Sequence, residues 1–411
     1  MPVVNRIAEF TEEMKIWRRH LHQYPELGFD CHDTAAYVVE RLKGFGINDI
    51  HTGIAKSGVV ALIHGRNSGS VIGLRADMDA LPIEEATGLD YSSKVSGKMH
   101  ACGHDGHTTM LLGAARYLQE TRNFSGTVAL IFQPAEEHGG GGEVMVQEGI
   151  LDQFNIETVY ALHTEPGMPV GQMSTTPGPI MAAVDTFEVY VTGQGGHGAM
   201  PHLAADAIPA AVSITQAFQT IVSRNHNPVE DLVVSVTQIH GGTIDNVIND
   251  DAFVGGTVRT FSSDVRDMVD RRMAEICQGH AKAFGVDVNC VYTRGYPATI
   301  NSDAQTAFAV DVAKEICGDN MVVSDRPRDM GAEDFSYLLE KKPGCYLYLG
   351  QGEGAAWHNA AFDFNDEASP VGASFFVRLV ERALPLAVSY THLRAHETRG
   401  NLVCRRVLEK K

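Results

Sequence analysis

In the first 165 residues of this 411-residue chain, short apolar runs of strand length alternate with a helical run. This pattern constrains the fold more strongly than any other feature of the sequence. Runs of strand length cover residues 59–64, 71–75, 126–132 and 158–162, and a helical run covers residues 108–118. This alternation predicts an α/β fold with a mixed, mostly parallel sheet and helices on both faces. The polar segments 76–79, 133–137 and 163–165 follow three of these runs, at the sheet edge where α/β proteins bind ligands.

A second unit is predicted from about residue 181. Its strands cover 186–191, 232–239, 253–260 and 286–292, and its helices cover 204–222 and 265–284. That βαββαβ order is typical of a ferredoxin-like arrangement. The pattern of the first unit returns with helices at 304–316, 335–339 and 371–386 and a strand at 346–349. We therefore expect one unit, made of residues 1–180 and 295–388, to be interrupted by a smaller unit at 181–294.

Residues 389–411 differ from the rest of the chain in composition. They hold six basic and two acidic residues and too few apolar residues for a core-facing surface. Their first ten residues resemble translated sequencing-adapter read-through, so we interpret the segment as a non-native tail; a native basic tail is the alternative.

Charge and composition exclude several classes of function. The chain has 33 Lys and Arg against 51 Asp and Glu, a net charge of -18, which disfavours nucleic acid and anionic membranes as partners. No stretch of about 18 apolar residues and no signal-peptide pattern are present, so we expect a soluble protein. Seven cysteines in a chain of this length predict reduced thiols and a cytoplasmic location.

The densest set of reactive side chains lies in residues 99–108. A thiol, three imidazoles and a carboxylate fall within nine positions there. Cys102 and His104 flank a glycine, which lets both side chains turn toward one ion, and Asp105 or Gly106 can begin the following helix. We expect Cys102 and His104 to be metal ligands, and His100 and His107 to be hydrogen-bonded structural residues.

Further ligand-type residues follow other predicted strands. In the adjacent pair Glu136 and Glu137, one carboxylate can bind metal while the other acts as a general base; a solvated acidic turn is the alternative. His163 and His358 add imidazoles and complete a set large enough for two metals. Asp77 or Asp79 could accept the second ring N–H of a ligand histidine.

These motifs resemble one enzyme family. The matching segments, in order, are residues 18–27, 75–82, 99–108, 133–137, 195–199, 256–259, 330–335 and 357–359. They look like the dinuclear-metal amidohydrolases typified by hippurate hydrolase, N-acyl-amino-acid aminoacylases and indole-acetyl-amino-acid hydrolases, over about residues 6–388. The resemblance implies a catalytic domain interrupted by a lid or dimerisation domain at 181–294, and a homodimer or homotetramer formed through that lid.

The resemblance also implies a role for each site residue. The implied metal ligands are Cys102, His104, Glu137, His163 and His358. Glu136 is implied as the base that activates water. Asp79 supports the ligand shell. The ions are two divalent metals, Zn²⁺ or Mn²⁺, with Co²⁺ or Ni²⁺ also compatible with such ligands.

Three residues of the lid are implied as substrate contacts. His197 is expected to stabilise the oxyanion in a neighbouring active site, and Asn246 and Arg259 to contact the substrate carboxylate. A surface ion pair is the alternative for Arg259. The family usually has Pro after Asn-Val-Ile, whereas Asn249 occupies that position here.

The expected reaction is hydrolysis of the amide bond of an N-acyl-L-amino acid, which releases the amino acid and a carboxylic acid. A dipeptidase or carboxypeptidase of the same family is the alternative, decided by pocket residues near Met181, Ala182 and Gly350. A non-catalytic metal-binding protein is a third hypothesis, which the presence of Glu136 disfavours. Glu333 and Asp334 are interpreted either as acids at a helix N-terminus or as support for the site.

Overall fold

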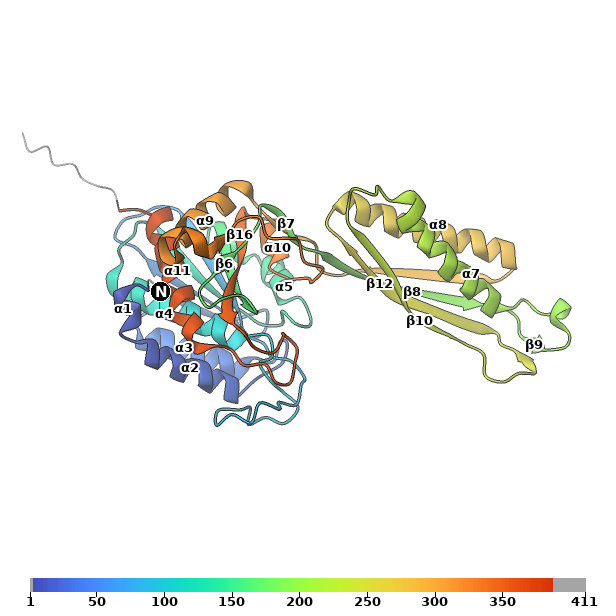
Figure 1. Ribbon diagram of the computed structural model, residues 1–411, viewed down its shortest axis with the longest axis horizontal. Coiled ribbons are helices and arrows are strands. Elements are labelled where there is room, and N and C mark those ends of the chain that lie inside the picture. Colours follow the sequence, from blue (N-terminus) through green and yellow to red (C-terminus); the bar gives the residue numbers. More distant parts are fainter. Residues whose placement is uncertain (1–2, 387–411) are drawn as a thin grey trace, which may run out of the picture.

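A computed structural model describes residues 3–386, which form two units joined by extended strands (Figure 1). The larger unit is built on an eight-stranded sheet whose four central strands, β4, β3, β5 and β16, run parallel. In spatial order, the strands are β1 (Ile50–Ile54), β2 (Gly58–His64), β4 (Thr127–Gln133), β3 (Val71–Asp77), β5 (Ile156–Pro166), β16 (Gly344–Gly352), β6 (Met173–Ser174) and β15 (Val322–Val323). The predicted mixed, mostly parallel sheet is confirmed.

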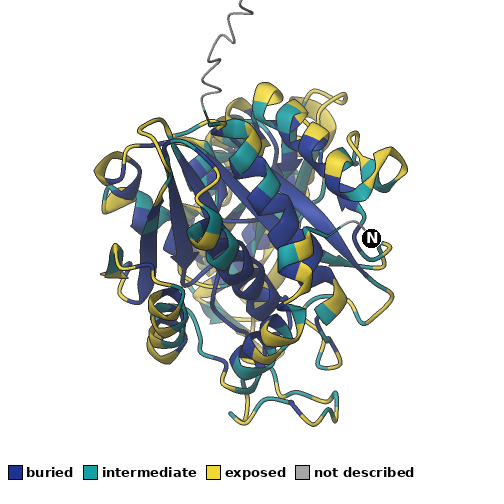
Figure 2. Ribbon diagram, turned by 90° about the vertical axis from the view of Figure 1, so that its left-hand side faces the viewer, coloured by how far each residue is buried: buried dark blue, intermediate teal, exposed yellow. Residues whose placement is uncertain are grey.

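Helices cover both faces of this sheet because its strands are apolar on both sides. Along β4, for example, Leu130 belongs to one buried cluster and Ile131 to the other. One face packs against α1 (Asn5–Ala8), α2 (Thr11–Gln23), α3 (His32–Gly44), α4 (His104–Thr121), α9 (Asp303–Cys317) and α11 (Ser369–Ala383). The other packs against α5 (Gly141–Gln147), α6 (Ile150–Gln153) and α10 (Ser336–Leu339). Figure 2 shows this buried interior between partly exposed helices.

The smaller unit has a separate core. Its sheet has the order β10 (Leu232–Gly241), β12 (Asp251–Thr260), β8 (Ala183–Thr192) and β13 (Asp287–Arg294), and all neighbours are antiparallel. Helices α7 (Ala207–Thr220) and α8 (Ser263–Phe284) lie on one face of it (Figure 1). Phe187 and Phe218 pack edge to face in this core, with ring centroids 5.4 Å apart.

Short elements connect and extend the two units. Strands β7 (Gly178–Met181) and β14 (Thr299–Asn301) pair where the chain leaves and re-enters the larger unit. Strands β9 (Gly196–His197) and β11 (Val247–Ile248) form a ribbon at the far end of the smaller unit (Figure 1). The remaining short helices are η1 (Pro201–Leu203), η2 (Ile221–Asn225), η3 (Asp319–Met321) and η4 (Asp366–Ala368).

Several expectations differ in detail from the structure. Helix α4 begins at His104, rather than at Asp105 or Gly106, because Gly103 adopts φ 95° and turns the chain directly into the helix. The amino-terminal helices α2 and α3 were not predicted. The proposed tail at 389–411 lies outside the described residues. Within residues 3–386, no helix is both long and apolar enough to cross a membrane.

Candidate metal centre and active site

The ends of three parallel strands bring the predicted polar segments together. Asp77 ends β3, Glu136 and Glu137 follow β4, and His163 lies within β5 next to Thr164. Because neighbouring parallel strands end at the same edge of a sheet, these side chains lie close together, and Glu136, Glu137 and His163 line one pocket of about 230 Å³. Its lining includes four of the five predicted metal ligands, Cys102, Glu137, His163 and His358, and the predicted base Glu136.

The loop before α4 places the thiol and the first imidazole. A side chain at Gly103 would put its Cβ 2.6 Å from Thr164 Oγ1, so only glycine fits between Cys102 and His104. Cys102 Sγ lies 3.4 Å from His163 Nε2. The Nδ1–H of His163 donates to the backbone oxygen of Thr164 at 2.8 Å, which leaves Nε2 facing the thiol.

The five predicted ligands form one connected set. Ligand atoms lie within 4.8 Å of one another in three overlapping groups: Cys102, His104 and His163; Cys102, Glu137 and His358; and His104, Glu136 and Glu137. Glu137 Oε1 lies 3.8 Å from His104 Nε2 and 3.3 Å from His358 Nε2. His358 is the most exposed member, at 54% for its side chain, and its backbone has φ 60°.

Two observations indicate that these residues fit divalent cations. The buried His104 Nε2 and Glu137 Oε1 atoms have no hydrogen-bond partner among the described residues. Burial lowers the pKa of His104, but the nearby carboxylates of Asp77, Asp79 and Glu137 raise it to about 10. A thiol, imidazoles and carboxylates in so negative a setting are a donor set suited to divalent metals such as Zn²⁺.

Asp79 connects the acidic loop to His104. Its Oδ1 accepts the Glu136 N–H at 3.1 Å, and its Oδ2 accepts the Glu137 N–H at 3.0 Å. The same carboxylate faces His104 Nδ1 at 3.3 Å, which leaves His104 Nε2 directed toward Glu137. One buried side chain therefore positions two adjacent acids and one imidazole.

The electrostatic environment of Glu136 suits a general base. Burial raises its pKa well above the ordinary value, and Glu333, Glu137 and Asp334 raise it further, while Arg75 lowers it. A carboxylate with a raised pKa takes up a proton more readily near neutral pH.

A buried ion cluster centred on Arg75 reaches the pocket through Glu333, and the sequence analysis did not predict the part that Arg75 plays in it. Arg75 bonds to Asp77 at 2.7 Å, Glu333 at 2.8 Å and Asp334 at 3.0 Å, and all four side chains are almost completely buried. Glu333 also accepts the Phe335 N–H at 2.9 Å, just before α10, which agrees with its interpretation as an acid at a helix N-terminus, while its support of the site stays a prediction. An arginine within an otherwise apolar strand was the signal available in the sequence.

His107 and His100 lie behind the pocket. His107 donates from Nδ1 to Asp77 Oδ1 at 2.7 Å, and its Nε2 accepts the Thr164 N–H at 2.9 Å. Both of its ring nitrogens are therefore occupied by protein groups, as expected for a structural residue. His100 is buried with neither ring nitrogen paired within residues 3–386, so the expectation that it is hydrogen-bonded was wrong, and burial lowers its pKa to about 4.

Arg259 lies beside the pocket, where β12 approaches the larger unit. Its Nε donates to the backbone oxygen of Met330 at 3.2 Å, between the lining residues Asp329 and Gly331. Within the described part of the chain, no acidic side chain forms an ion pair with it. Of the three positions expected to set pocket size, Met181 lines the pocket, whereas Ala182 and Gly350 do not.

His197 and Asn246 lie away from this pocket. Both are exposed in the ribbon at the far end of the smaller unit, where the Gly198 N–H donates to the Asn246 carbonyl at 2.9 Å (Figure 1). The structure of one chain therefore does not bring them to the metal ligands.

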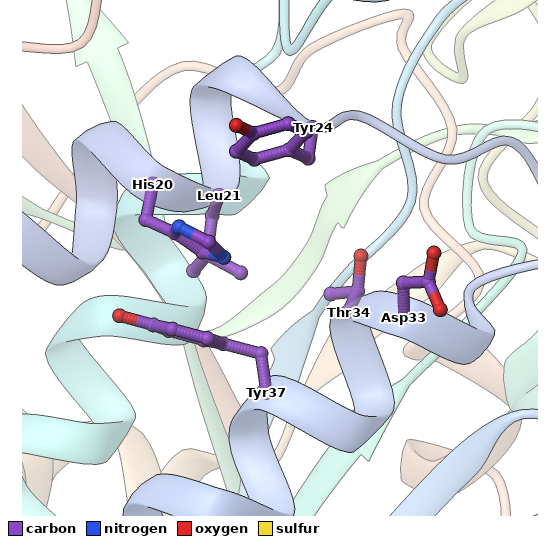
Figure 3. Close-up of a pocket in the computed structure, with 6 residues that line it drawn as sticks. All are labelled: His20, Leu21, Tyr24, Asp33, Thr34 and Tyr37. Carbon is purple, nitrogen blue, oxygen red and sulfur yellow. The ribbon is translucent and has the colours of Figure 1, made fainter.

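A second pocket, of about 240 Å³, lies between α2 and α3 (Figure 3). The His20 ring stacks on Tyr37 there, with ring centroids 4.2 Å apart, and Thr34 and Asp33 lie at its side. None of its lining residues belongs to a metal-ligand group in the described chain. The pocket at the strand ends is the candidate active site.

Comparisons with known proteins identify the family of this chain. The chain is 43% identical over 361 residues to an N-acetyl-L-cysteine deacetylase from Bacillus subtilis, covering 88% of this chain and 85% of that protein. It is 38% identical over 385 residues to the hippurate hydrolase of Campylobacter jejuni, covering 93% and 100%. A dinuclear metal-binding peptidase from Bacillus subtilis superposes with a TM-score of 0.81 at 34% identity, covering 92% and 99%. Residues 73–382 match Peptidase family M20/M25/M40, and the chain belongs to that family.

Proposed function

We propose that this protein hydrolyses the amide bond of N-acyl-L-amino acids with two bound divalent metal ions. The observation that carries the proposal is a buried acid, Glu136, which lines one pocket together with four metal-type ligands and lies close to the fifth, His104. The names of the relatives support this reaction, since an N-acetylcysteine deacetylase and a hippurate hydrolase both cleave such amides. Cys102, His104, Glu137, His163 and His358 would hold the metals, with Zn²⁺ or Mn²⁺ preferred and Co²⁺ or Ni²⁺ compatible.

The side chains would divide the chemical work. When bound, the metals supply Lewis acidity that polarises the carbonyl and makes water easier to deprotonate. Glu136 takes the proton of the attacking water and delivers it to the leaving nitrogen. Arg259 offers a planar donor group beside the pocket for the carboxylate of the substrate.

His197 and Asn246 would act in the active site of a second copy of the chain. We propose that the smaller unit, residues 181–294, is a ferredoxin-like lid and dimerisation domain. In support, β10 lies at an edge of its sheet in the described chain, and Ile239 on that strand is 50% exposed. Val212 on α7 is 42% exposed, so strand and helix together offer an apolar surface for a second copy.

Mixing two inactive variants tests this shared site. Glu136→Gln removes the base from one chain, and His197→Ala removes the lid imidazole from the other. A mixed dimer with sites shared in this way has one complete site, so an equal mixture should recover about a quarter of wild-type activity. No recovery after confirmed subunit exchange would contradict a role for His197 in a neighbouring site.

A substrate panel tests the reaction itself. Free amine is measured with hippurate, N-acetyl-methionine, indole-acetyl-alanine, N-acetyl-diaminopimelate and a dipeptide, before and after metal chelation. We expect metal-dependent release from at least one N-acyl amino acid. Cleavage of the dipeptide alone would instead support the peptidase alternative.

The cysteines bear on location. The six within residues 3–386 are free thiols, which supports the proposal of a cytoplasmic protein.

A further inference from the structure

One tyrosine hydroxyl holds the acidic loop in addition to Asp79. Tyr296 donates to the backbone oxygen of Glu136 at 2.7 Å and accepts the Gly140 N–H at 3.1 Å. A single oxygen atom thus closes the loop that carries both Glu136 and Glu137. Burial raises the pKa of Tyr296, so the hydroxyl keeps its proton and remains a donor to Glu136.

The acidic loop needs such support because its backbone is unusual. Ala135 has φ 59°, a left-handed conformation that is uncommon for a residue with a side chain. Gly139 and Gly140 also have positive φ, at 114° and 67°. A loop in this conformation keeps its shape only when surrounding groups fix it. Asp79 accepts the N–H groups of Glu136 and Glu137, and Tyr296 bonds to the Glu136 carbonyl and the Gly140 N–H.

The backbone of Tyr296 belongs to the connection between the two units. It lies two residues after the end of β13, and its carbonyl accepts the Val184 N–H of β8 at 3.0 Å. Its neighbour Gly295 donates to the Val184 carbonyl at 3.0 Å and to Asp185 Oδ1 at 3.1 Å. Arg266 of α8 pairs with Asp185 and donates to the Gly295 carbonyl at 2.8 Å. The main chain at 295–296 is therefore tied to the smaller unit.

From this geometry we infer that Tyr296 is a positioning residue, which links the placement of the smaller unit to the placement of Glu136. The inference rests on the proposed role of Glu136 as the base. A change in the angle of β8 and β13 moves the Tyr296 backbone, and the hydroxyl transmits that movement to the acidic loop. Tyr296 itself neither lines the pocket nor belongs to a group of metal ligands.

Tyr296→Phe removes only the hydroxyl and is the first test. We expect kcat on an N-acyl amino acid to fall about 10- to 100-fold, with bound metal unchanged and KM within about twofold, because loop geometry rather than substrate contact is altered. Tyr337→Phe is the matched control. Its ring packs against Tyr296 with centroids 6.1 Å apart, and its hydroxyl contacts the Gly295 carbonyl, at 3.4 Å, and Glu143. Because it forms no hydrogen bond to residues 135–140 within the described chain, kcat should stay near wild type.

Hydrogen–deuterium exchange gives a readout that does not depend on activity. The Gly140 N–H loses its acceptor in Tyr296→Phe, so a peptide spanning residues 136–142 should exchange faster in that variant and not in Tyr337→Phe. Unchanged exchange together with wild-type kcat in Tyr296→Phe would overturn the inference. If Glu136→Gln, assayed alongside, stayed active, the proposed base itself would be wrong.

A double-mutant cycle tests the link to the smaller unit. Asp185→Asn weakens the anchor of residues 295–296 without touching the acidic loop. If Tyr296 transmits its position, Asp185→Asn lowers kcat in the wild-type background and has little further effect in Tyr296→Phe. Fully additive losses would show that the hydroxyl positions the loop independently of the smaller unit and would refute the link.

Discussion

Replacing Asp79 with asparagine should weaken the metal centre without changing any metal ligand. Asp79 accepts the Glu136 and Glu137 N–H groups at 3.1 and 3.0 Å and faces His104 Nδ1 at 3.3 Å. Asparagine keeps one acceptor oxygen and adds an NH₂ group, which must face either a backbone donor or the His104 ring. At least one of these contacts is lost, and the charge that orients His104 disappears.

The size of the effect follows from these contacts. A hydrogen bond to a charged group contributes about 1.5–3 kcal/mol. Each 1.4 kcal/mol corresponds to a factor of ten, so one lost contact predicts roughly a 10- to 150-fold loss of metal affinity or turnover. Losses of about 10- to 100-fold are usual when a group supporting a metal ligand is altered.

Competition with a chromophoric chelator measures the metal affinity of Asp79→Asn, and release of free amine measures its turnover. The folded state is checked by urea denaturation, so that a loss of metal is not mistaken for unfolding. Metal affinity and kcat both equal to the wild type would refute the positioning role assigned to Asp79.

Two further predictions concern stability. A Cβ on Gly141 would lie 1.7 Å from the Pro134 carbonyl oxygen, so Gly141→Ala should lower the free energy of unfolding by about 3 kcal/mol; Gly279→Ala, where the added Cβ meets nothing within 4 Å, should raise it by about 0.5–1 kcal/mol. Equal effects in urea denaturation would contradict this contrast. Burial lowers the pKa of His22, but hydrogen bonds to Asp105 and a second carboxylate raise it to about 9. Below pH 6.5 the raised pKa of His22 adds up to about 3 kcal/mol to the free energy of unfolding, and this stabilisation is lost as pH rises through 9. His22→Gln should therefore remove that part of the pH dependence of unfolding.

The parts of the fold that the sequence predicts best are those with a regular apolar pattern. Strands β2, β3, β4 and β5 are buried on both faces, so their continuous apolar runs are visible without tertiary information. Helix α2 is harder to identify because Arg18 and His22 lie on its buried face, paired with Asp366 and Asp105. Polar residues at core positions obscure the periodicity that indicates a helix.

The candidate site likewise contains residues that can be recognised from the sequence and residues that cannot. Cys102, His104 and the adjacent acids are recognisable because their residue types are dense and follow strand ends. The contact between Arg75 and Glu333 is not recognisable, since the two residues lie 258 positions apart and nothing local indicates that they meet. Tyr296 was missed for the same reason, because its hydroxyl reaches a backbone carbonyl 160 positions away. Such contacts are products of tertiary folding.

The central claim is that Glu136 moves protons in a metal-dependent amide hydrolysis, while neighbouring side chains hold the metals. Metal-free wild type and Glu136→Gln would each be titrated with Zn²⁺ or Mn²⁺, with bound metal and free amine from an N-acyl amino acid measured in the same samples. We predict equal metal binding, metal-dependent turnover in the wild type, and turnover lower by about 10²- to 10⁴-fold in Glu136→Gln. Turnover by the metal-free wild type, or near-normal turnover by metal-loaded Glu136→Gln, would contradict the claim.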